Sequence, residues 1–380
     1  MENTAHLKVL LVAEGSGGHL IPAFQVARTL TKAGATIKLW YAHRRQTERL
    51  IEQLAHETTA GAVEMDPMMI TRSTNPLTRL WQCGQLWHRA EQCFDTFSPD
   101  VVVGFGGWLS APIVLAARRR HISCVLHEQN VVMGRANRLL VPWVDRVALS
   151  FHETHPSIRP DRSVMTGLPV RTEIGEGSRS HAAARFGFDP AKPTLLVLGG
   201  SQGARAINRI MTQLIRQLTG SEQQTWQILH VTGAADQSEV QRAYADANVR
   251  ARVASFCEEM AAAYATADVV IARAGASTIA ELARCGKPAI LIPYPHAGGH
   301  QLANARLVEA IGGGLMLQEH EATPERVLGF IRRLLTDQRL RRVMGMQMRV
   351  LGTSDAADRL AELIVELASS RSAQNGMIAG

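Results

Sequence analysis

Apolar residues in this chain come in short runs, separated by glycine-rich turns and by segments with helical periodicity. The first run, Leu7 to Ala13, leads into a glycine turn and a helical segment from Pro22 to Ala33. The same order starts again with Thr194 to Leu198, a second glycine turn and a helical segment from Ala204 to Leu218. A short apolar run that enters a glycine turn and a helix is typical of a parallel α/β sheet. Because the pattern starts twice, the sequence predicts two Rossmann-like domains.

The remaining elements follow from the same periodicities. Strands are predicted at Thr36 to Tyr41, Asp100 to Val103, Ile122 to Leu126, Gln227 to Val231, Val253 to Phe256, Val269 to Ala272 and Ala289 to Pro293. Helices are predicted at Gln46 to His56, Pro324 to Leu335, Leu340 to Val350 and Ala356 to Ala368. After GLPVR at Gly167 to Arg171, the glycine- and serine-rich stretch EIGEGSRS predicts the interdomain passage. Ser369 to Gly380 is predicted to be a frayed tail.

The apolar run Val269 to Ala272 enters a turn of small residues around Gly275 and then a helix that contains Glu281. The amides at such a helix start suit a phosphate, and a carboxylate one turn later can reach the two hydroxyls of a ribose. The alternative is a capping box from Thr278 to Glu281, in which the carboxylate satisfies a backbone amide. The residues alone leave both interpretations open.

Three polar loops follow strands in the first half of the chain. They are Glu14 to His19, Gly104 to Ser110 and His127 to Asn130. In a doubly wound sheet these loops converge, which predicts one anion-binding cleft. His19 is either a base or phosphate donor there, or an imidazole that bonds its own turn. The polar side chains after His127 either line the cleft or satisfy nearby backbone groups.

Composition narrows the class of protein. The chain has 380 residues and a net charge of +7, and residues 1–171 contain 19 Lys and Arg against 14 Asp and Glu. A basic half needs an anionic partner, which can be nucleic acid, phospholipid head groups or a pyrophosphate. No nucleic-acid-binding motif accompanies the charge, so nucleic acid is the least favoured. The five scattered cysteines lack metal-ligand spacing and are predicted to be small core residues.

One amphipathic segment stands apart from the rest. Between Arg72 and Arg89, the residues Leu77, Leu80, Trp81 and Gly84 recur at helical spacing, with Trp87 near the same face. Core packing is the default interpretation of such a stripe, and an anionic membrane surface is the alternative. Arg118 to Arg120 either extends that basic surface or is a solvated helix end. No apolar run reaches transmembrane length and no signal-like segment opens the chain, so a cytoplasmic protein is expected.

Seven ordered motifs carry a family resemblance over about residues 7 to 370. They are GSGGHLIPA, GFGGWLSAP, HEQN-x3-G-x2-NR, GLPVR, LGGSQGA-x2-N, RAGAST-x-AEL and HQ-x2-NA. In this order and spacing they resemble the MurG family of bacterial cell-wall enzymes, in glycosyltransferase family 28. The resemblance implies a GT-B fold, that is, two Rossmann-like parallel-sheet domains that face each other across a cleft. It also implies inverting transfer of N-acetylglucosamine from UDP-N-acetylglucosamine to lipid I, which gives lipid II for peptidoglycan synthesis.

The resemblance assigns a role to each domain. Residues 1–168, with a returning helix at 354–370, are expected to form the acceptor and membrane-associating domain, residues 169–352 the UDP-sugar domain, and residues 371–380 a tail. The implied location is the cytoplasmic face of the inner membrane, with the protein bound peripherally to an anionic surface. No metal is expected, since the chain has no D-x-D motif, and no cofactor and no nucleic acid are expected either.

The same motifs imply the site residues. Expected on the donor side are Arg171, Ser201, Gln202, Cys257, Ala276, Ser277, Thr278, Glu281, His300, Gln301 and Asn304. On the acceptor side Ser16, Gly17, Gly18, Gly106, Gly107 and Asn130 would hold the pyrophosphate, with His19 and Glu128 as catalytic residues. Two alternatives remain: a GT-B lipid glycosyltransferase that resembles diacylglycerol galactosyltransferases, and a non-catalytic nucleotide-sugar-binding protein at the membrane.

Overall fold

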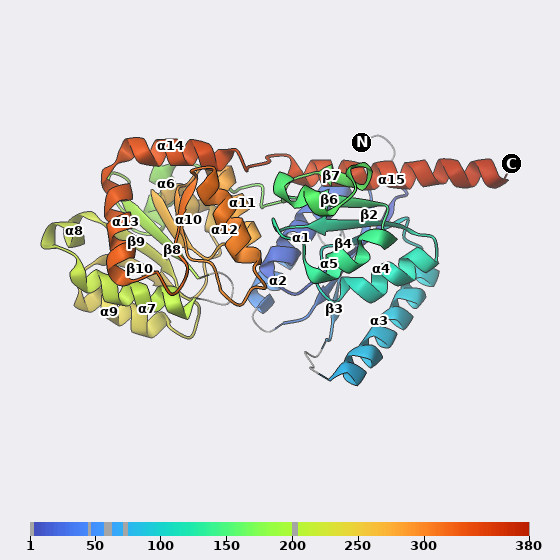
Figure 1. Cartoon of the computed structure of the whole chain (residues 1–380), viewed down its shortest axis with the longest axis horizontal. Coiled ribbons are helices and arrows are strands. Elements are labelled where there is room, and N and C mark those ends of the chain that lie inside the picture. Colours follow the sequence, from blue (N-terminus) through green and yellow to red (C-terminus); the bar gives the residue numbers. More distant parts are fainter. Residues whose placement is uncertain (1–3, 45–46, 57–62, 71–74, 200–203, 380) are drawn as a thin grey trace. The chain divides into compact units, whose positions relative to one another are not determined.

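The computed structural model describes residues 4–44, 47–56, 63–70, 75–199 and 204–379. The chain forms two compact units (Figure 1). Unit 1 consists of Met1–Val170 together with Asp355–Gly380, and unit 2 consists of Arg171–Ser354. The last helix of the chain therefore belongs with the amino-terminal sheet.

Unit 1 is built on a parallel sheet with the order β3-β2-β1-β4-β5-β6-β7. Its strands are β1 (Lys8–Ala13), β2 (Thr36–Ala42), β3 (Val63–Met68), β4 (Val101–Gly104), β5 (Ser123–Glu128), β6 (Arg146–Leu149) and β7 (Ser163–Met165). The central strands are buried along nearly their whole length, which requires the continuous apolar runs seen in the sequence. Chain order reverses between β1 and β4, and this switch point is where α/β sheets bind ligands.

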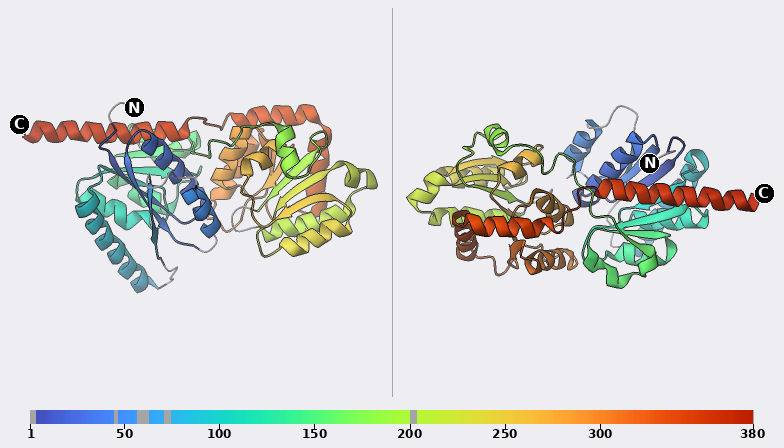
Figure 2. Two further views of the ribbon diagram at one scale, coloured as in Figure 1. Left: turned by 180° about the vertical axis from the view of Figure 1, so that it is seen from behind. Right: turned by 90° about the horizontal axis from the view of Figure 1, so that it is seen from above.

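Helices cover both faces of this sheet. They are α1 (Gly17–Lys32), α2 (Glu48–His56), α3 (Pro76–Phe97), α4 (Ser110–Arg119), α5 (Arg135–Leu140) and α15 (Ala356–Ala379), with 3-10 turns at η2 (Val141–Trp143), η3 (His152–Ser157) and η4 (Pro160–Arg162). One core contains residues of α1, α2 and α15, and the other contains residues of α3, α4 and α5. Figure 2 shows α15 running beside α1, which it contacts.

Unit 2 repeats the arrangement with the strand order β10-β9-β8-β11-β12-β13. Its strands are β8 (Thr194–Leu198), β9 (Gln227–Val231), β10 (Arg250–Ala254), β11 (Val269–Ala272), β12 (Ala289–Leu291) and β13 (Gly314–Met316). Its helices are α6 (Arg179–Arg185), α7 (Arg205–Leu214), α8 (Gly220–Thr225), α9 (Gln237–Asp246), α10 (Met260–Thr266), α11 (Ala276–Cys285), α12 (His300–Ala310), α13 (Pro324–Thr336) and α14 (Gln338–Arg349), with a 3-10 turn η5 (Ile215–Gln217). Here the switch point lies between β8 and β11.

The predicted fold class, two Rossmann-like parallel-sheet domains, is confirmed, and several local predictions need correction. Helix α1 begins at Gly17, so Pro22 lies inside it and not at its start, and β10 lies at Arg250–Ala254 instead of Val253 to Phe256. Strand β5 continues to Glu128, so His127 lies inside the strand instead of the loop that follows it. The predicted tail is wrong, because α15 continues as helix to Ala379. The hydroxyls of Ser369 and Ser370 donate to the carbonyls four residues earlier, and this bonding is compatible with a continuing helix.

Two other predictions concern the burial of the cysteines and the absence of a membrane-spanning helix. Four of the five cysteines are buried, as expected for core residues, and Cys83 is half-buried. Across the part of the chain that the structure describes, no helix is both long and apolar enough to cross a membrane.

Candidate active site

The first glycine turn of unit 1 connects β1 to α1. Gly15 is required because a Cβ at this position would lie 1.8 Å from the carbonyl oxygen of Ala42. Helix α1 begins at Gly17, so the amides of Gly17 and Gly18 lie in its first turn, where helix amides have no acceptor within the helix. Oγ of Ser16 lies 2.7 Å from Nδ1 of His19. The turn thus combines backbone donors, the positive end of a 16-residue helix and an imidazole.

The second glycine turn lies against the first. Strands β1 and β4 pair in parallel, so their carboxyl ends are neighbours. A Cβ on Gly106 would lie 3.6 Å from Cδ2 of His19 and 3.4 Å from Nδ2 of Asn137. Gly106 has φ +84° and Gly107 has φ +81°, a conformation that favours glycine. A Cβ on Gly107 would also collide with the Glu14 carboxylate.

Glu128, at the end of β5, organises the third loop. Its Oε1 accepts from the backbone amide of Asn130 at 3.0 Å and from the Asn130 side chain at 3.3 Å. Its Oε2 accepts from the amide of Gly134 at 2.9 Å and from Nδ2 of Asn137 at 2.8 Å. The carboxylate is buried and bonded on both oxygens. This arrangement matches the alternative in which the polar residues satisfy the backbone of their own loop.

The three loops converge at the switch point of unit 1, as the sequence predicts. Asn137 joins them, because it lies beside Gly106 and donates to Glu128, and sequence reasoning did not assign it a role. Its place within the HEQN-x3-G-x2-NR motif was the available signal. Its Oδ1 atom is buried and has no hydrogen-bond partner among the described residues. Burial lowers the pKa of nearby His127 to about 4, although a hydrogen bond to the carbonyl of Gly167 opposes the shift.

In unit 2, the turn between β11 and α11 has the geometry expected of an anion site. Helix α11 begins at Ala276 after Gly275, so Thr278 stands inside the first turn and is not the cap. The capping-box alternative for Thr278 and Glu281 is therefore wrong. Oγ of Ser277, in the same turn, is buried without a hydrogen-bond partner among the described residues. The first turn also contains no acidic residue that would repel an anion.

Glu281 lies one turn further along α11, where the Tyr264 hydroxyl donates to its Oε2 at 2.8 Å. Burial raises the pKa of Glu281, while the hydrogen bond from Tyr264 and the charge of Arg171 lower it. Burial raises the pKa of the Cys257 thiol to about 11, with Glu258 adding to the shift and Arg171 opposing it. The structure therefore brings Arg171, Cys257 and Glu281 into one electrostatic neighbourhood. Sequence reasoning missed Tyr264, because one aromatic residue in an apolar helix gives no separate signal.

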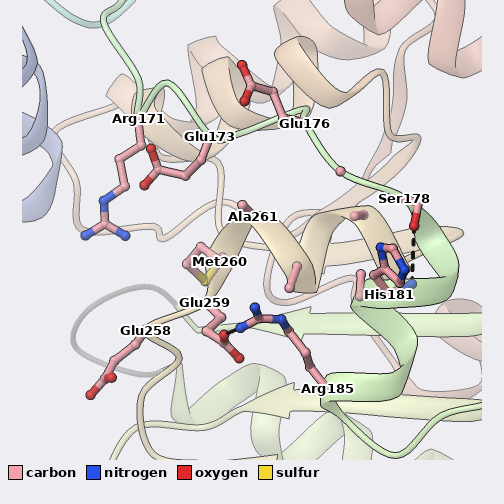
Figure 3. A pocket seen from close by; sticks show the side chains of 14 residues that line it. Arg171, Glu173, Glu176, Ser178, His181, Arg185, Glu258, Glu259, Met260 and Ala261 are labelled. Atoms are coloured by element: carbon pink, nitrogen blue, oxygen red, sulfur yellow. Dashed lines mark hydrogen bonds and ion pairs between the residues drawn. The ribbon is translucent and has the colours of Figure 1, made fainter.

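A pocket of about 380 Å³ opens beside Arg171 (Figure 3). Its walls come from the segment that contains Arg171 and Glu173, from α6, and from α10 with the two glutamates before it. Figure 3 shows Arg171 and Glu258 extending to the same side, away from His181. The pocket has room for a ring-sized group, and its lining carries both signs of charge.

Helix α12 and the loop before it contain the other predicted donor-side residues. Asn304 is fully buried and donates from Nδ2 to the carbonyl of Ala274 at 3.2 Å, so it braces the β11–α11 turn. Oε1 of Gln301 accepts from the amide of Tyr294 at 2.9 Å and holds the loop against α12. A Cβ on Gly298 would lie 3.4 Å from Nε2 of His300, so this imidazole lies beside Gly298.

Arg273 fixes the same loop from the other side. Its Nη1 donates to the carbonyl of Ile292 at 3.1 Å, and its Nη2 pairs with Glu319 at 2.6 Å. Ser201 and Gln202, two predicted donor-side residues, lie outside the described residues, at 200–203. Within the described ranges, no group of three or more His, Cys, Asp or Glu side chains is arranged to hold a metal ion.

The amphipathic segment forms the start of α3. Leu77, Leu80 and Trp81 are 74%, 71% and 63% exposed, so the core interpretation is wrong for this end of the helix. Trp87, two turns later, packs partly against the core of unit 1. In Figure 1 the amino-terminal end of α3 extends beyond the strands of its unit. Arg120 pairs with Glu91 and Asp95 on α3, at 2.6 Å each, so it joins two helices and does not extend a basic surface.

Comparisons with known proteins agree with this description. The model of the glycosyltransferase family 28 N-terminal domain matches residues 9–149, and that of the C-terminal domain matches residues 194–362. A UDP-N-acetylglucosamine–N-acetylmuramyl-(pentapeptide) pyrophosphoryl-undecaprenol N-acetylglucosamine transferase of Mesorhizobium japonicum is 37% identical, over 96% of both chains. A protein of the same name from Syntrophotalea carbinolica is 37% identical, over 93% of this chain and 97% of its own.

A solved structure gives the same result. The crystal structure of Acinetobacter baumannii MurG matches with a TM-score of 0.73 and 28% sequence identity, over 95% of this chain and 99% of its own. The resemblance that the sequence motifs indicate is therefore confirmed.

Proposed function

Because this chain belongs to glycosyltransferase family 28, we propose that it transfers N-acetylglucosamine from UDP-N-acetylglucosamine to lipid I and so makes lipid II. The observation that carries the proposal is the near-complete match to N-acetylglucosaminyltransferases of that name. Two helix-start sites, one at the switch point of each sheet, support it, because the reaction needs two diphosphates to be held. One diphosphate belongs to the nucleotide sugar and the other to the lipid.

In this proposal unit 2 binds the donor. The first turn of α11 holds the UDP phosphates, and the unbonded Oγ of Ser277 supplies a hydroxyl donor there. Ala276 and Thr278 add backbone amides from the same turn. Glu281 accepts from the ribose hydroxyls, and Arg171 and Cys257 lie beside the uracil. The sugar faces His300, Gln301 and the region of Asn304. Gln301 holds the loop before α12, and Asn304 holds the turn between β11 and α11.

Unit 1 binds the acceptor. The amides of Gly17 and Gly18 and the hydroxyl of Ser16 receive the lipid pyrophosphate, and the turn at Gly106 and Gly107 completes the cradle. Asn130 lies at the edge of this cradle, on the loop that Glu128 holds. Because both Glu128 oxygens are already bonded, we assign Glu128 to positioning and His19 to proton transfer.

The transfer step inverts the configuration at C1 of the sugar. The acceptor hydroxyl attacks C1 of N-acetylglucosamine while the bond from C1 to the UDP oxygen breaks, and UDP leaves with the electron pair. Nε2 of His19 takes the hydroxyl proton, provided that Nδ1 carries a hydrogen and donates it to Oγ of Ser16. The charge that develops on UDP is stabilised by the amino terminus of α11 and by Arg171. No step requires a resident metal ion.

A lipid acceptor would lie in a membrane, and the exposed apolar end of α3 is suited to contact a membrane surface. We propose that Leu77, Leu80 and Trp81 rest on the surface of the cytoplasmic membrane and bring unit 1 to its substrate. Arg79, exposed beside them, favours an anionic surface. The protein is then a peripheral protein at the inner face of the cell membrane.

A transfer assay tests the function. The protein is incubated with a soluble lipid I analogue and either UDP-N-acetylglucosamine or UDP-galactose, and separately with diacylglycerol vesicles. We expect N-acetylglucosamine to be transferred to the lipid I analogue alone. Transfer of galactose to diacylglycerol would establish the diacylglycerol galactosyltransferase alternative. Binding of UDP without transfer to any lipid would instead establish a nucleotide-sugar-binding protein.

A further inference from the structure

Helices α10 and α11 contribute two buried side chains that bond to each other. Tyr264 on α10 is fully buried, and its hydroxyl donates to Oε2 of Glu281 on α11 at 2.8 Å. The two helices contact each other directly, so the bond spans a packed interface. A phenol hydroxyl in the interior needs an acceptor, and here the acceptor is a carboxylate that the donor site also uses.

The hydrogen bond leaves part of the carboxylate available. An ionised carboxylate has two oxygens and accepts about four hydrogen bonds. The hydroxyl of Tyr264 supplies one of them, to Oε2. Arg171 is the other group that acts on Glu281, through its positive charge. Without Tyr264 the carboxylate would be free to rotate, because the last torsion of a glutamate side chain is broad.

We propose that Tyr264 is a positioning residue that fixes Glu281 so that its remaining oxygen meets the hydroxyls of the nucleotide ribose. The inference rests on the proposed function, since it takes a UDP-sugar as the ligand of unit 2. The inference adds that ribose recognition depends on two side chains, Glu281, which contacts the ribose, and Tyr264, which does not touch the ligand. Preorganisation of this kind raises affinity because less freedom is lost on binding.

The titratable groups around Tyr264 and Glu281 affect the protonation state of the Glu281 carboxylate. The charged or titratable groups that act on Glu281 are Tyr264 and Arg171. Cys257, just before α10, and Cys285, at the end of α11, act on Tyr264, and Cys285 also interacts with Glu281. Burial raises the pKa of Glu281, and the phenol hydroxyl opposes that rise. A protonated carboxyl group cannot accept from two hydroxyls as well as its anion does. Tyr264 therefore favours the ionised carboxylate, which is the form that binds a diol.

The test measures ribose recognition by calorimetry. UDP and 2′,3′-dideoxy-UDP are titrated into the wild-type protein and into Tyr264→Phe, which removes one oxygen atom. We expect the variant to bind UDP about tenfold more weakly, and to bind the dideoxy nucleotide as the wild type does. The wild type should discriminate between the two nucleotides, and the variant should largely lose that discrimination.

A matched control comes from the same unit. Tyr244 is also fully buried, and its hydroxyl bonds to Nδ1 of His230 at 2.9 Å instead of to Glu281. Tyr244→Phe removes the same atom from an equally buried position, so it should lower the melting temperature comparably. It should leave the discrimination between the two nucleotides intact. Equal loss of discrimination in both variants would mean that the effect is structural and would overturn the proposal.

Two further measurements make the outcome unambiguous. In a Glu281→Gln background, adding Tyr264→Phe should cause no further loss of discrimination, because the two residues act as one unit. Loss of the Tyr264 hydrogen bond should raise the pKa of Glu281 further. In an acid titration, Tyr264→Phe should therefore lose UDP binding at a higher pH than the wild type does. Full ribose discrimination in Tyr264→Phe refutes the proposal, whereas a wild type that binds no UDP refutes the proposed function itself.

Discussion

Oγ of Ser16 lies 2.7 Å from Nδ1 of His19, within the first turn of α1. If His19 accepts a proton at Nε2, this contact selects the required tautomer. Ser16→Ala should then lower kcat roughly threefold to tenfold, and Ser16→Thr should keep most of the activity. His19→Ala should lower kcat about 10²-fold to 10⁴-fold, the range typical of a general base. Steady-state assays with a lipid I analogue measure these rates, and unchanged turnover in His19→Ala would remove the assignment.

Glu128 is expected to matter for stability before it matters for chemistry. Its carboxylate accepts four hydrogen bonds, two from backbone amides and two from asparagine side chains. Glu128→Gln should lower the free energy of unfolding by about 1 to 3 kcal/mol, as measured by denaturant titration. Glu362→Gln, at an exposed carboxylate of the same unit, should change it by less than about 0.5 kcal/mol. Lost turnover with unchanged stability in Glu128→Gln would indicate a direct chemical role.

Acid should destabilise unit 2 through His230. Burial lowers the pKa of this imidazole to about 3, and its two nitrogens bond to Tyr244 and Asn208. The unfolded chain takes up a proton below about pH 6.5, and the folded chain does not until about pH 3. The unfolded state therefore binds more protons in this window, and the free energy of unfolding falls as the pH drops from 6.5 towards 3.

A substitution isolates that contribution. Between pH 7 and pH 5, His230→Gln should lose about 2 kcal/mol less stability than the wild type does, although it starts from a lower value at pH 7. Denaturant titrations at the two pH values provide the measurement. His320→Gln, at an exposed histidine, is the control and should leave the pH dependence as it is. Parallel pH dependence in His230→Gln and the wild type would contradict a neutral buried imidazole.

The exposed end of α3 should govern membrane binding. The double variant Leu80→Gln and Trp81→Gln removes two large apolar side chains that are 71% and 63% exposed. It should cosediment with anionic phosphatidylglycerol vesicles at least roughly tenfold more weakly, without a change in melting temperature. Met346→Gln on α14 is a matched control, because this residue is 62% exposed in unit 2. Vesicle binding that survives the double variant would show that α3 is not the membrane contact.

The sequence by itself determined the two-sheet architecture and the positions of its glycine-rich turns. A buried parallel strand must be apolar along its length, and Val269–Ala272 shows this pattern at the residues where β11 lies. The glycines of the turns are equally legible, because Gly15 and Gly107 leave no room for a side chain. The seven ordered motifs were sufficient to identify the family.

Only the tertiary structure decided what the polar side chains at these turns bond to. A motif gives no partner, so the sequence could name Glu128 as a candidate catalytic residue without showing that its carboxylate bonds to Asn137 and to neighbouring amides. Tyr264 meets Glu281 from another helix, 17 positions away in the chain, and no local pattern records that contact. The start of α3 is apolar in a way that fits a core as well as a surface. Burial depends on what packs above a helix, and that is a property of the folded chain as a whole.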